Sequence, residues 1–433
     1  MIGHLHKRLF VSITASLLVA TSLSGVGVLG AEGDDAGLDG VELNIWRKHY
    51  DQPGSDEIDK AFQAETGASI DVKKVPASAL KNLLPLWSAG ERPDVLIIEG
   101  YLTSLVKLGT ANLHPLDGLP AAEQLAPEHS QFGTLDGVRY WLPQTAPTNN
   151  SLLYNKEVIA ELGLDLPGTF EELIAFCEVA KDTTIPVVIG EKSNFMAWMT
   201  LAAMSSDFHL ENPDFKADLL ARTASFTDPE YVKRIQSIID IKEAGCFRDN
   251  AEAIDLTGAM NSFMAGEGAI FNCGNNCVSA LVGASDQASV DAKVGFLPIS
   301  YTKPVVWTNQ DGFGYYLPRT GNAEREAAAR AYVEFATGPG YEIYLDTQAV
   351  PSAYLHHSPP DPAAVAVPIL ESFQAAIDYP VVPGYEPLIP CGYGDLKPAL
   401  QEMFIGEKTA LQVAEGMDLG FEQSCKDLGY PGF

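Results

Sequence analysis

Residues 137–156 read GVRYWLPQTAPTNNSLLYNK, and this stretch decides how the chain is organised. Two aromatic side chains and a proline come first, a polar run with two asparagines follows, and Leu152, Leu153 and Tyr154 come next. A buried strand would avoid so many polar groups, whereas a surface loop would not carry that apolar triplet. We therefore expect an extended segment whose first part is polar and whose second part is buried.

The first thirty residues are organised like a secretory signal peptide. Lys7 and Arg8 belong to a short basic start, residues 9–20 form a mostly apolar run, and small residues follow as far as Ala31. The alternative is a membrane anchor, which needs an apolar run of ~20 residues, and this run is shorter. Because no cysteine lies in this region to carry a lipid, we expect cleavage after residues 1–30 and a soluble periplasmic protein.

The composition indicates a large, acidic, globular protein. Its 433 residues are too many for one core, so two domains are expected. Because 57 Asp and Glu residues outnumber 28 Lys and Arg residues, the net charge is −29, and such a surface repels nucleic acid and anionic lipid. Hydrophobic residues make up 46% of the chain, which argues against disorder.

The cysteine content is even, as expected for disulfides in an oxidising compartment. The cysteines are Cys177, Cys246, Cys273, Cys277, Cys391 and Cys425. Cys391 and Cys425 both lie in the C-terminal segment and form an attractive pair, and a bond between Cys273 and Cys277 is sterically possible. Zinc is the rival occupant of the CGNNC motif, but two thiols without a nearby histidine do not make a zinc site. No metal or other cofactor is expected.

Strand and helix patterns alternate at the start of the mature chain. They predict strands over 41–46, 68–76 and 93–99 and helices over 55–66 and 79–90. Ser55 is the expected cap of the first helix, and Gly67 is its expected end. This βαβαβ order predicts an α/β fold with a parallel open sheet and helices on both faces, in which ligands bind beyond the carboxyl ends of the strands.

A second set of patterns begins near Ser151. Strands are expected over 149–156, 185–190, 268–273, 294–298 and 312–318, with helices between and after them. Thr169 is the expected cap of a helix whose first turn carries Glu171 and Glu172, where the helix dipole favours negative charge.

In this order the pieces resemble the extracellular solute-binding protein family 1, the sugar-binding receptors of ATP-driven (ABC) importers. The most specific block is LDGVRYWLPQTAPTNNSLLYNKEVIAELGLDLPGTFEEL at 135–173. Other matching stretches are FQAETGASIDVKKVP (62–76), WSAGERPDVLIIEG (87–100), LGTANLHPLD (108–117), FMAGEGAIFNCG (263–274), VGFLPIS (294–300), AAARAYVEFATGPGYEIYL (327–345) and MFIGEKTALQVAEGMD (403–418).

The resemblance implies a two-lobed periplasmic binding protein fold, type II-like, in which each lobe is a mostly parallel sheet flanked by helices. Crossing hinge strands would join a first lobe of about 38–146 plus 290–320 to a second of about 147–289 plus 321–433. The resemblance also implies that the strand ending in Tyr154-Asn155-Lys156 follows the first crossing, along the wall of a ligand cleft. One departure concerns 272–277, because family members often carry a tryptophan there on which a sugar ring stacks. Here amides replace it, which implies a smaller or differently oriented ligand.

Sugars present apolar C–H faces and a rim of hydroxyls, so their sites need aromatic plates together with carboxylates, amides and guanidinium groups. The candidate ligand-binding residues are Trp46, His49, Tyr50, Glu99, Tyr101, Asn149, Trp198, Asn276, Trp307, Asp311 and Tyr393. Core packing is the alternative for Trp46 and Trp198, and solvation or a structural role is the alternative for the polar candidates. Trp307 and Asp311 lead, because an aromatic followed by a polar run and Gly312 suits a loop at the lobe junction.

The chain carries none of the catalytic motifs GxSxG, HExxH or GxxxxGK[ST]. We therefore expect a monomeric, non-enzymatic receptor that closes on a sugar or oligosaccharide and delivers it to membrane permease subunits of an ABC transporter. A binder of the same fold for a polyamine is one alternative, with Asp311 and Glu99 pairing ammonium groups and Trp307 offering a cation–π face. An exported glycoside hydrolase is the alternative from another class.

Overall fold

The computed structural model describes residues 37–48, 54–75, 79–125, 132–144, 148–193, 196–309, 312–348, 352–357, 365–383, 391–392 and 394–433. Leu38–Phe433 is a compact unit, and the account below concerns this unit alone. Within the described ranges, no helix combines the length and apolar character that a membrane crossing needs.

The first lobe is built on a five-stranded sheet with the order β2-β1-β3-β13-β6. Its strands are β1 (Glu42–Lys48), β2 (Ser69–Val75), β3 (Val95–Glu99), β6 (Leu142–Pro143) and β13 (Phe313–Tyr316). β1 pairs in parallel with β2 and β3, whereas β13 is antiparallel to β3 and β6. The predicted parallel βαβαβ unit is thus confirmed, and a strand from much later in the chain extends its sheet.

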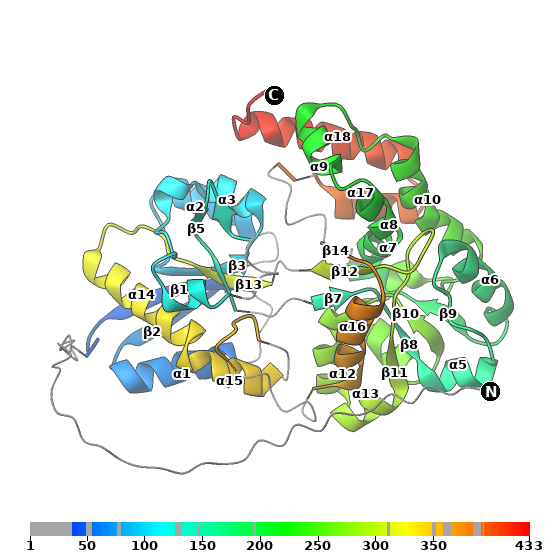
Figure 1. Cartoon of the computed structure of the whole chain (residues 1–433), viewed down its shortest axis with the longest axis horizontal. Coiled ribbons are helices and arrows are strands. Elements are labelled where there is room, and N and C mark those ends of the chain that lie inside the picture. The colour runs from blue at the N-terminus through cyan, green and yellow to red at the C-terminus, as the bar shows by residue number, and fades with distance from the viewer. Residues whose placement is uncertain are drawn as a thin grey trace, which may run out of the picture. The chain divides into compact units, whose positions relative to one another are not determined.

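Helices cover both faces of this first sheet (Figure 1). They are α1 (Ser55–Thr66), α2 (Ala79–Ser88), α3 (Leu102–Leu108), α14 (Ala323–Thr337) and α15 (Pro339–Gln348). Val95 and Ile97 point into the cluster that holds residues of α1, α14 and α15, whereas Leu96 and Ile98 point into the cluster with residues of α2 and α3. The alternation of side chains along β3 therefore produces the two hydrophobic layers.

The ends of α1 show how local sequence sets the helix limits. Gly67 ends the helix in the left-handed region at φ 77°, as predicted, and a side chain there would collide with Asp39. The N-cap is Gly54 rather than the predicted Ser55. Ser55 is instead the first helical residue, and its Oγ accepts a hydrogen bond from Nε2 of Gln144 at 2.9 Å.

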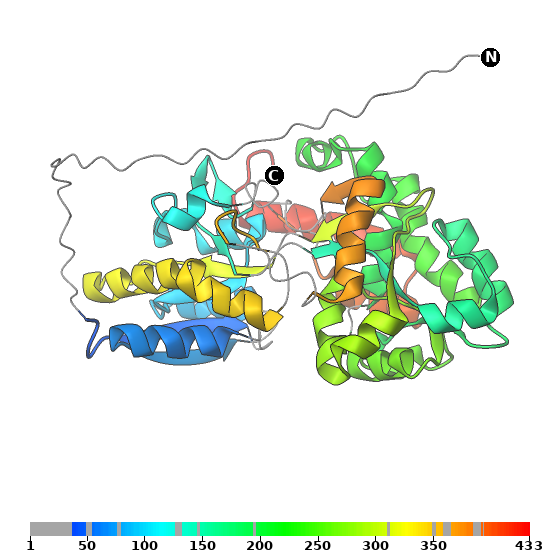
Figure 2. The same ribbon diagram turned by 60° about the horizontal axis from the view of Figure 1, so that its bottom comes forward.

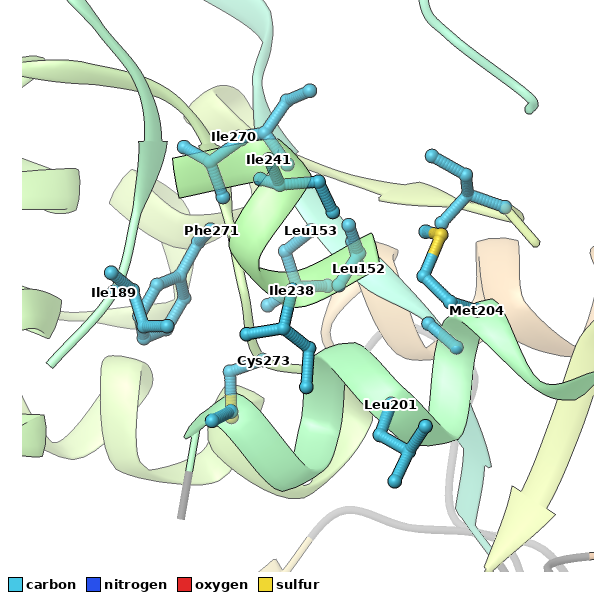
Figure 3. Close-up of a cluster of buried hydrophobic side chains, with 14 of the residues drawn as sticks. Leu152, Leu153, Ile189, Leu201, Met204, Ile238, Ile241, Ile270, Phe271 and Cys273 are labelled. Carbon is cyan, nitrogen blue, oxygen red and sulfur yellow. The ribbon is translucent and has the colours of Figure 1, made fainter. Parts of the chain in front are cut away.

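The second lobe is built on a four-stranded sheet with the order β11-β8-β10-β9. Its strands are β8 (Leu152–Asn155), β9 (Ile185–Val188), β10 (Gly268–Phe271) and β11 (Val294–Leu297). β10 is parallel to β9, whereas β8 is antiparallel to β10 and β11. Figure 3 shows apolar side chains of these strands and of the neighbouring helices meeting in one buried cluster.

The second lobe carries more helices than the first, as the views in Figures 1 and 2 show. They include α5 (Lys156–Leu162), α6 (Phe170–Ala180), α7 (Met196–Met204), α8 (Ser206–Glu211), α9 (Phe215–Ala221), α10 (Pro229–Glu243), α11 (Leu256–Met264), α12 (Val278–Ala284), α13 (Gln287–Lys293), α16 (Val367–Asp378), α17 (Leu396–Phe404) and α18 (Ala410–Asp427). Thr169 caps α6 in a capping box with Glu172, which confirms the predicted cap.

A third, three-stranded sheet contains the strands that cross between the lobes. It has the order β14-β12-β7, with β7 at Thr148–Asn150, β12 at Val306–Asn309 and β14 at Val381–Pro383. β7 connects β6 of the first sheet to β8 of the second, and the antiparallel β12 connects β11 of the second sheet back to β13 of the first. The predicted crossing strand is confirmed, although it is two strands, because Ser151 separates polar β7 from apolar β8.

The strand pairing differs from the predicted limits of the lobes. We expected 290–320 in the first lobe and 321–433 in the second, but β11 pairs with β8 in the second sheet. Tyr332 of α14 and Tyr341 of α15 lie in the core of the first lobe. The chain therefore crosses at β12, after β11, and again after α15. An amphipathic helix shows by its pattern that it covers a sheet, but the pattern does not identify which sheet.

Disulfides tie the second lobe together. Both pairs considered from the sequence are present, Cys391–Cys425, which was favoured, and Cys273–Cys277, which was only judged possible. The remaining pair, Cys177–Cys246, joins α6 to the segment after α10. Among the described residues, no group of three or more His, Cys, Asp and Glu side chains is arranged to hold a metal ion.

Candidate ligand site

The crossing strands β7 and β12 bring polar side chains into a buried position. Their register places Trp307 opposite Asn150 and Thr308 opposite Asn149. Asn149 and Asn150 are 6% and 0% exposed, and Trp307 and Thr308 are 3% and 6% exposed. Because opposite residues of an antiparallel pair point to the same face, each face of the pair carries one asparagine beside one residue of β12.

The 3-10 turn η5 (Asn275–Cys277) and helix α16 extend this polar cluster. Nδ2 of Asn149 donates to the backbone carbonyl of Ser372 at 3.3 Å, and Nδ2 of Asn275 donates to Oγ of the same serine. A side chain at Gly274 would place its Cβ 2.6 Å from Oδ1 of Asn150. The loop after β10 therefore lies directly against β7, and only glycine fits at the contact.

Several buried atoms of this cluster have no hydrogen-bond partner in the described part of the chain. They are Oδ1 of Asn150, Oδ1 of Asn275, Oγ1 of Thr308 and Nε1 of Trp307. Unpartnered buried atoms occur elsewhere too, but these belong to neighbouring elements, since β7 pairs with β12 and η5 packs on β7. Leaving such groups unsatisfied costs ~1–3 kcal/mol each, so a concentration of them is expected where a bound molecule supplies the missing partners.

Trp198 of α7 and Lys397 of α17 lie beside this cluster. The ring of Trp198 meets Trp307 edge to face, with 5.8 Å between the ring centroids and 89° between the planes. Nζ of Lys397 lies 4.5 Å from the centroid of the Trp198 ring. Trp307 packs against Met199 and Val382, whereas Trp198 is only partly buried. The structure thus brings together the candidates Trp198 and Trp307, whereas Asn149 lies on the other face of the strand pair, against Ser372.

The first-lobe candidates lie at the ends of strands, as the sequence suggested. Glu99 is the last residue of β3 and Tyr101 precedes α3, and both are half-buried. Trp46, near the end of β1, is only 3% exposed and packs in the core with Leu96 and Ile98. This low exposure and these apolar neighbours give the indole the surroundings of a core residue. Nζ of Lys73 lies 4.3 Å from the centroid of the Trp46 ring.

Four candidates, His49, Tyr50, Asp311 and Tyr393, lie outside the described residues. Asn276 is exposed in η5, whereas its neighbour Asn275 is buried and faces Ser372.

Several residues of the cluster were missed by sequence reasoning. Asn275 belongs to the recognised CGNNC motif, but the sequence does not reveal which of its two amides turns inward. Ser372 lies in an ordinary amphipathic helix, where its pattern gives no signal. Gln144 of the first lobe, outside this cluster, was also not a candidate, although it is 1% exposed and has an Oε1 atom without a partner in the described part of the chain.

A family model described as bacterial extracellular solute-binding protein matches residues 50–343. The chain belongs to this family.

Relatives and solved structures agree with this assignment. The osmoprotective compounds-binding protein GgtB of Synechocystis sp. is 25% identical over 225 residues, which are 49% of this chain and 48% of that protein. The chain thus spans about half the length of this curated relative.

A chitin oligosaccharide binding protein superposes with a TM-score of 0.73 at 18% identity, covering 89% of this chain and 100% of the other. A sugar transporter from Bacillus licheniformis in complex with stachyose gives 0.70 at 16% identity, covering 89% and 100%. The GacH receptor of Streptomyces glaucescens gives 0.68 at 18% identity, covering 89% and 98%. These likenesses establish the two-lobed fold, and the family and the structures named here are binding proteins.

Proposed function

We propose that this protein is the substrate-binding receptor of an ABC importer, and that it captures a neutral sugar or oligosaccharide between its lobes and delivers it to permease subunits. The observation that carries the proposal is the set of unpartnered polar atoms on β7, β12 and η5. Amide and hydroxyl oxygens accept hydrogen bonds from sugar hydroxyls, and an indole N–H donates to them. Closure of the lobes about β7 and β12 would bury the bound molecule.

The charges of the cluster favour a neutral ligand over a polyamine. The side chains of Asn149, Asn150, Asn275 and Ser372 carry no charge, and the ammonium group of Lys397 lies beside the ring of Trp198. A polyamine would be repelled by this ammonium group. The polyamine alternative relies on Glu99, at the carboxyl end of β3, and on Asp311.

The other site assignments are part of the same proposal. We expect Trp198, Trp307, Asn149 and Asn276 to contribute contacts from the second lobe, and the first lobe to contribute contacts at the ends of β1 and β3. The first-lobe residues are His49, Tyr50, Glu99 and Tyr101, and the connecting segments add Asp311 and Tyr393. Trp46 would support this edge from the core. Names of related structures that mention chitin oligosaccharides and stachyose support a carbohydrate, and the family's extracellular character supports secretion. We further propose that the receptor acts as a monomer.

A ligand panel tests the proposal directly. Melting temperature is measured with chitin oligosaccharides, stachyose, acarbose, α-D-tagatose and, as the competing class, spermidine and putrescine. We expect at least one sugar to raise the melting temperature and both polyamines to leave it unchanged, because only a ligand of the native state stabilises it. A shift with polyamines alone would overturn the sugar assignment.

Product analysis on the best sugar separates a receptor from a glycoside hydrolase. We expect the sugar to be recovered intact after prolonged incubation with the protein. Small-angle scattering with and without that sugar tests closure, and a radius of gyration that does not decrease would contradict the hinged receptor.

A further inference from the structure

We infer that the Cys273–Cys277 disulfide is a positioning device for the ligand site, which holds the CGNNC loop against crossing strand β7 so that Asn275 faces the ligand. The inference rests on the proposed function. It assigns a role in binding to a bond that contributes less to global stability than the other two disulfides do.

The three disulfides differ in the length of chain that they close. Cys177–Cys246 and Cys391–Cys425 are separated by 69 and 34 residues, whereas Cys273–Cys277 is separated by only 4. A disulfide stabilises mainly by restricting the unfolded chain, and this effect grows with the length of the closed loop. The short bond therefore contributes least to global stability and acts mainly on the conformation of the residues that it encloses.

The bond anchors both ends of the loop in the core of the second lobe. Cys273 and Cys277 are 0% and 2% exposed and belong to the same hydrophobic cluster as Phe271 of β10. The bond thereby fixes the start and the end of η5 on the sheet. The residues between the two cysteines are the ones that reach β7 and α16.

Contacts inside the loop show what the bond positions. Asn275 is 6% exposed, donates from Nδ2 to Oγ of Ser372, and has an Oδ1 atom without a partner in the described part of the chain. Ser372 in turn donates to the carbonyl of Ile369 at 2.7 Å, and its own carbonyl accepts from Asn149. Asn275 and Asn149 are therefore locked to the same serine, one from the loop and one from the crossing strand.

Gly274 shows how closely the loop is seated. A Cβ there would lie 2.6 Å from Oδ1 of Asn150 and 3.1 Å from the carbonyl of Ser151. Because any displacement of η5 changes this contact, the disulfide couples the amide of Asn275 to the amide of Asn150. The disulfide thereby restricts the positions of both unpartnered Oδ1 atoms.

The test compares the double variant Cys273→Ser with Cys277→Ser against the control double variant Cys177→Ser with Cys246→Ser, whose disulfide closes a longer stretch of chain and adjoins no proposed ligand contact. The probe is the panel sugar that gives the largest melting shift with the unmodified protein. We expect the loop variant to raise the Kd at least tenfold and to lower the melting temperature only slightly. The control is expected to lower the melting temperature more, with a Kd unchanged at temperatures where it is folded.

Hydrogen exchange gives a readout that needs no ligand. We expect the backbone amides of 272–277 and 148–151 to exchange faster in the loop variant than in the unmodified protein, and those of 148–151 to remain protected in the control. An unchanged Kd together with unchanged exchange in the loop variant would overturn the inference while leaving the proposed function intact. If no sugar binds the unmodified protein, that result would instead contradict the proposed function.

Gly274→Ala keeps the inference testable if the double serine variant does not fold. It leaves the disulfide in place but pushes the loop away from Asn150, so it is expected to raise the Kd by a similar factor. A Kd equal to that of the unmodified protein would show that the seating of the loop does not matter.

Discussion

Two buried polar groups of the second lobe differ in how they are satisfied. The carboxylate of Asp207, which is 0% exposed, accepts hydrogen bonds from the backbone of Phe208 at 2.9 Å, from Oγ1 of Thr302 at 2.6 Å and from Nη2 of Arg234 at 3.2 Å. The equally buried Asn150 has an Oδ1 atom without a partner in the described part of the chain.

This difference in hydrogen-bond partners distinguishes buried polar residues that stabilise the fold from those proposed to bind a ligand. A buried polar group that serves stability is surrounded by partners from its own chain, because an unsatisfied group costs free energy. Where such atoms gather without partners, as on β7, β12 and η5, the proposed function implies that a bound molecule offsets this cost. Removing a satisfied group should therefore damage folding, whereas removing an unsatisfied one should damage binding.

Replacing Asp207 by Ala tests the structural half of this comparison and should have the largest effect. The change leaves Arg234, which is 4% exposed, without its buried partner. Breaking such a pair costs ~3–5 kcal/mol of unfolding free energy. Chemical denaturation measures the loss, and the Kd for the panel sugar should stay within about twofold, roughly 0.4 kcal/mol, under conditions where the variant is folded. A stability loss below ~1 kcal/mol would remove the structural role assigned to this carboxylate.

His209 provides a pH-dependent test of the same region. Burial lowers its pKa to about 3 from 6.5, so below pH 6.5 the unfolded chain takes up a proton that the folded chain does not. Stability is therefore lost as the pH falls from about 6.5 toward 3, and by pH 5 this residue accounts for ~2 kcal/mol. We expect His209→Gln to reduce the difference in unfolding free energy between pH 7 and pH 5 by about that amount. An identical pH dependence in both proteins would contradict the assignment.

Local patterns in the sequence were enough to predict most of the fold. The βαβαβ unit and the cap at Thr169 depend on residues close together in the chain, so periodicity and capping chemistry reveal them. The crossing near Asn149 was implied by the resemblance to a family. The assignment of α14 and α15 to the first lobe depends on their packing against strands that are distant in the sequence. The pattern of the helices carries no information about that packing.

The candidate site was predictable only in part. Trp46 and Trp307 look alike in sequence, since each is an aromatic residue followed by a run of polar residues, although Trp307 was expected in a loop and lies in β12. Trp46 packs in a core cluster of the first lobe, whereas Trp307 packs with residues of α7 and β14 beside the crossing strands. Tertiary contacts decide which neighbours each tryptophan meets. Likewise, the turn of η5 rather than the composition of CGNNC decides that Asn275 is buried and Asn276 exposed.

Asn150→Ala tests the binding half of the comparison. The variant loses the hydrogen bond from Nδ2 to Oγ1 of Thr148 but also removes a buried oxygen without a partner. Because the two effects oppose each other, we expect the unfolding free energy to change by less than ~1 kcal/mol. The Kd for the panel sugar, measured by titration calorimetry, should rise by roughly 10- to 100-fold, or ~1.4–2.7 kcal/mol. A large stability loss with unchanged affinity would assign Asn150 to the fold instead.

Thr308→Val is the smallest and sharpest change, because it replaces one hydroxyl by a methyl group of similar size. Oγ1 of Thr308 is buried and unpartnered in the described part of the chain, so its removal relieves a desolvation cost rather than breaking a bond. We expect the unfolding free energy to stay the same or to rise by up to ~1 kcal/mol, while the Kd for the panel sugar rises several-fold. Stability and affinity would then move in opposite directions at one atom, which a purely structural residue does not allow. If stability fell and affinity stayed constant, the hydroxyl would have a structural partner and the comparison with Asp207 would fail at this position.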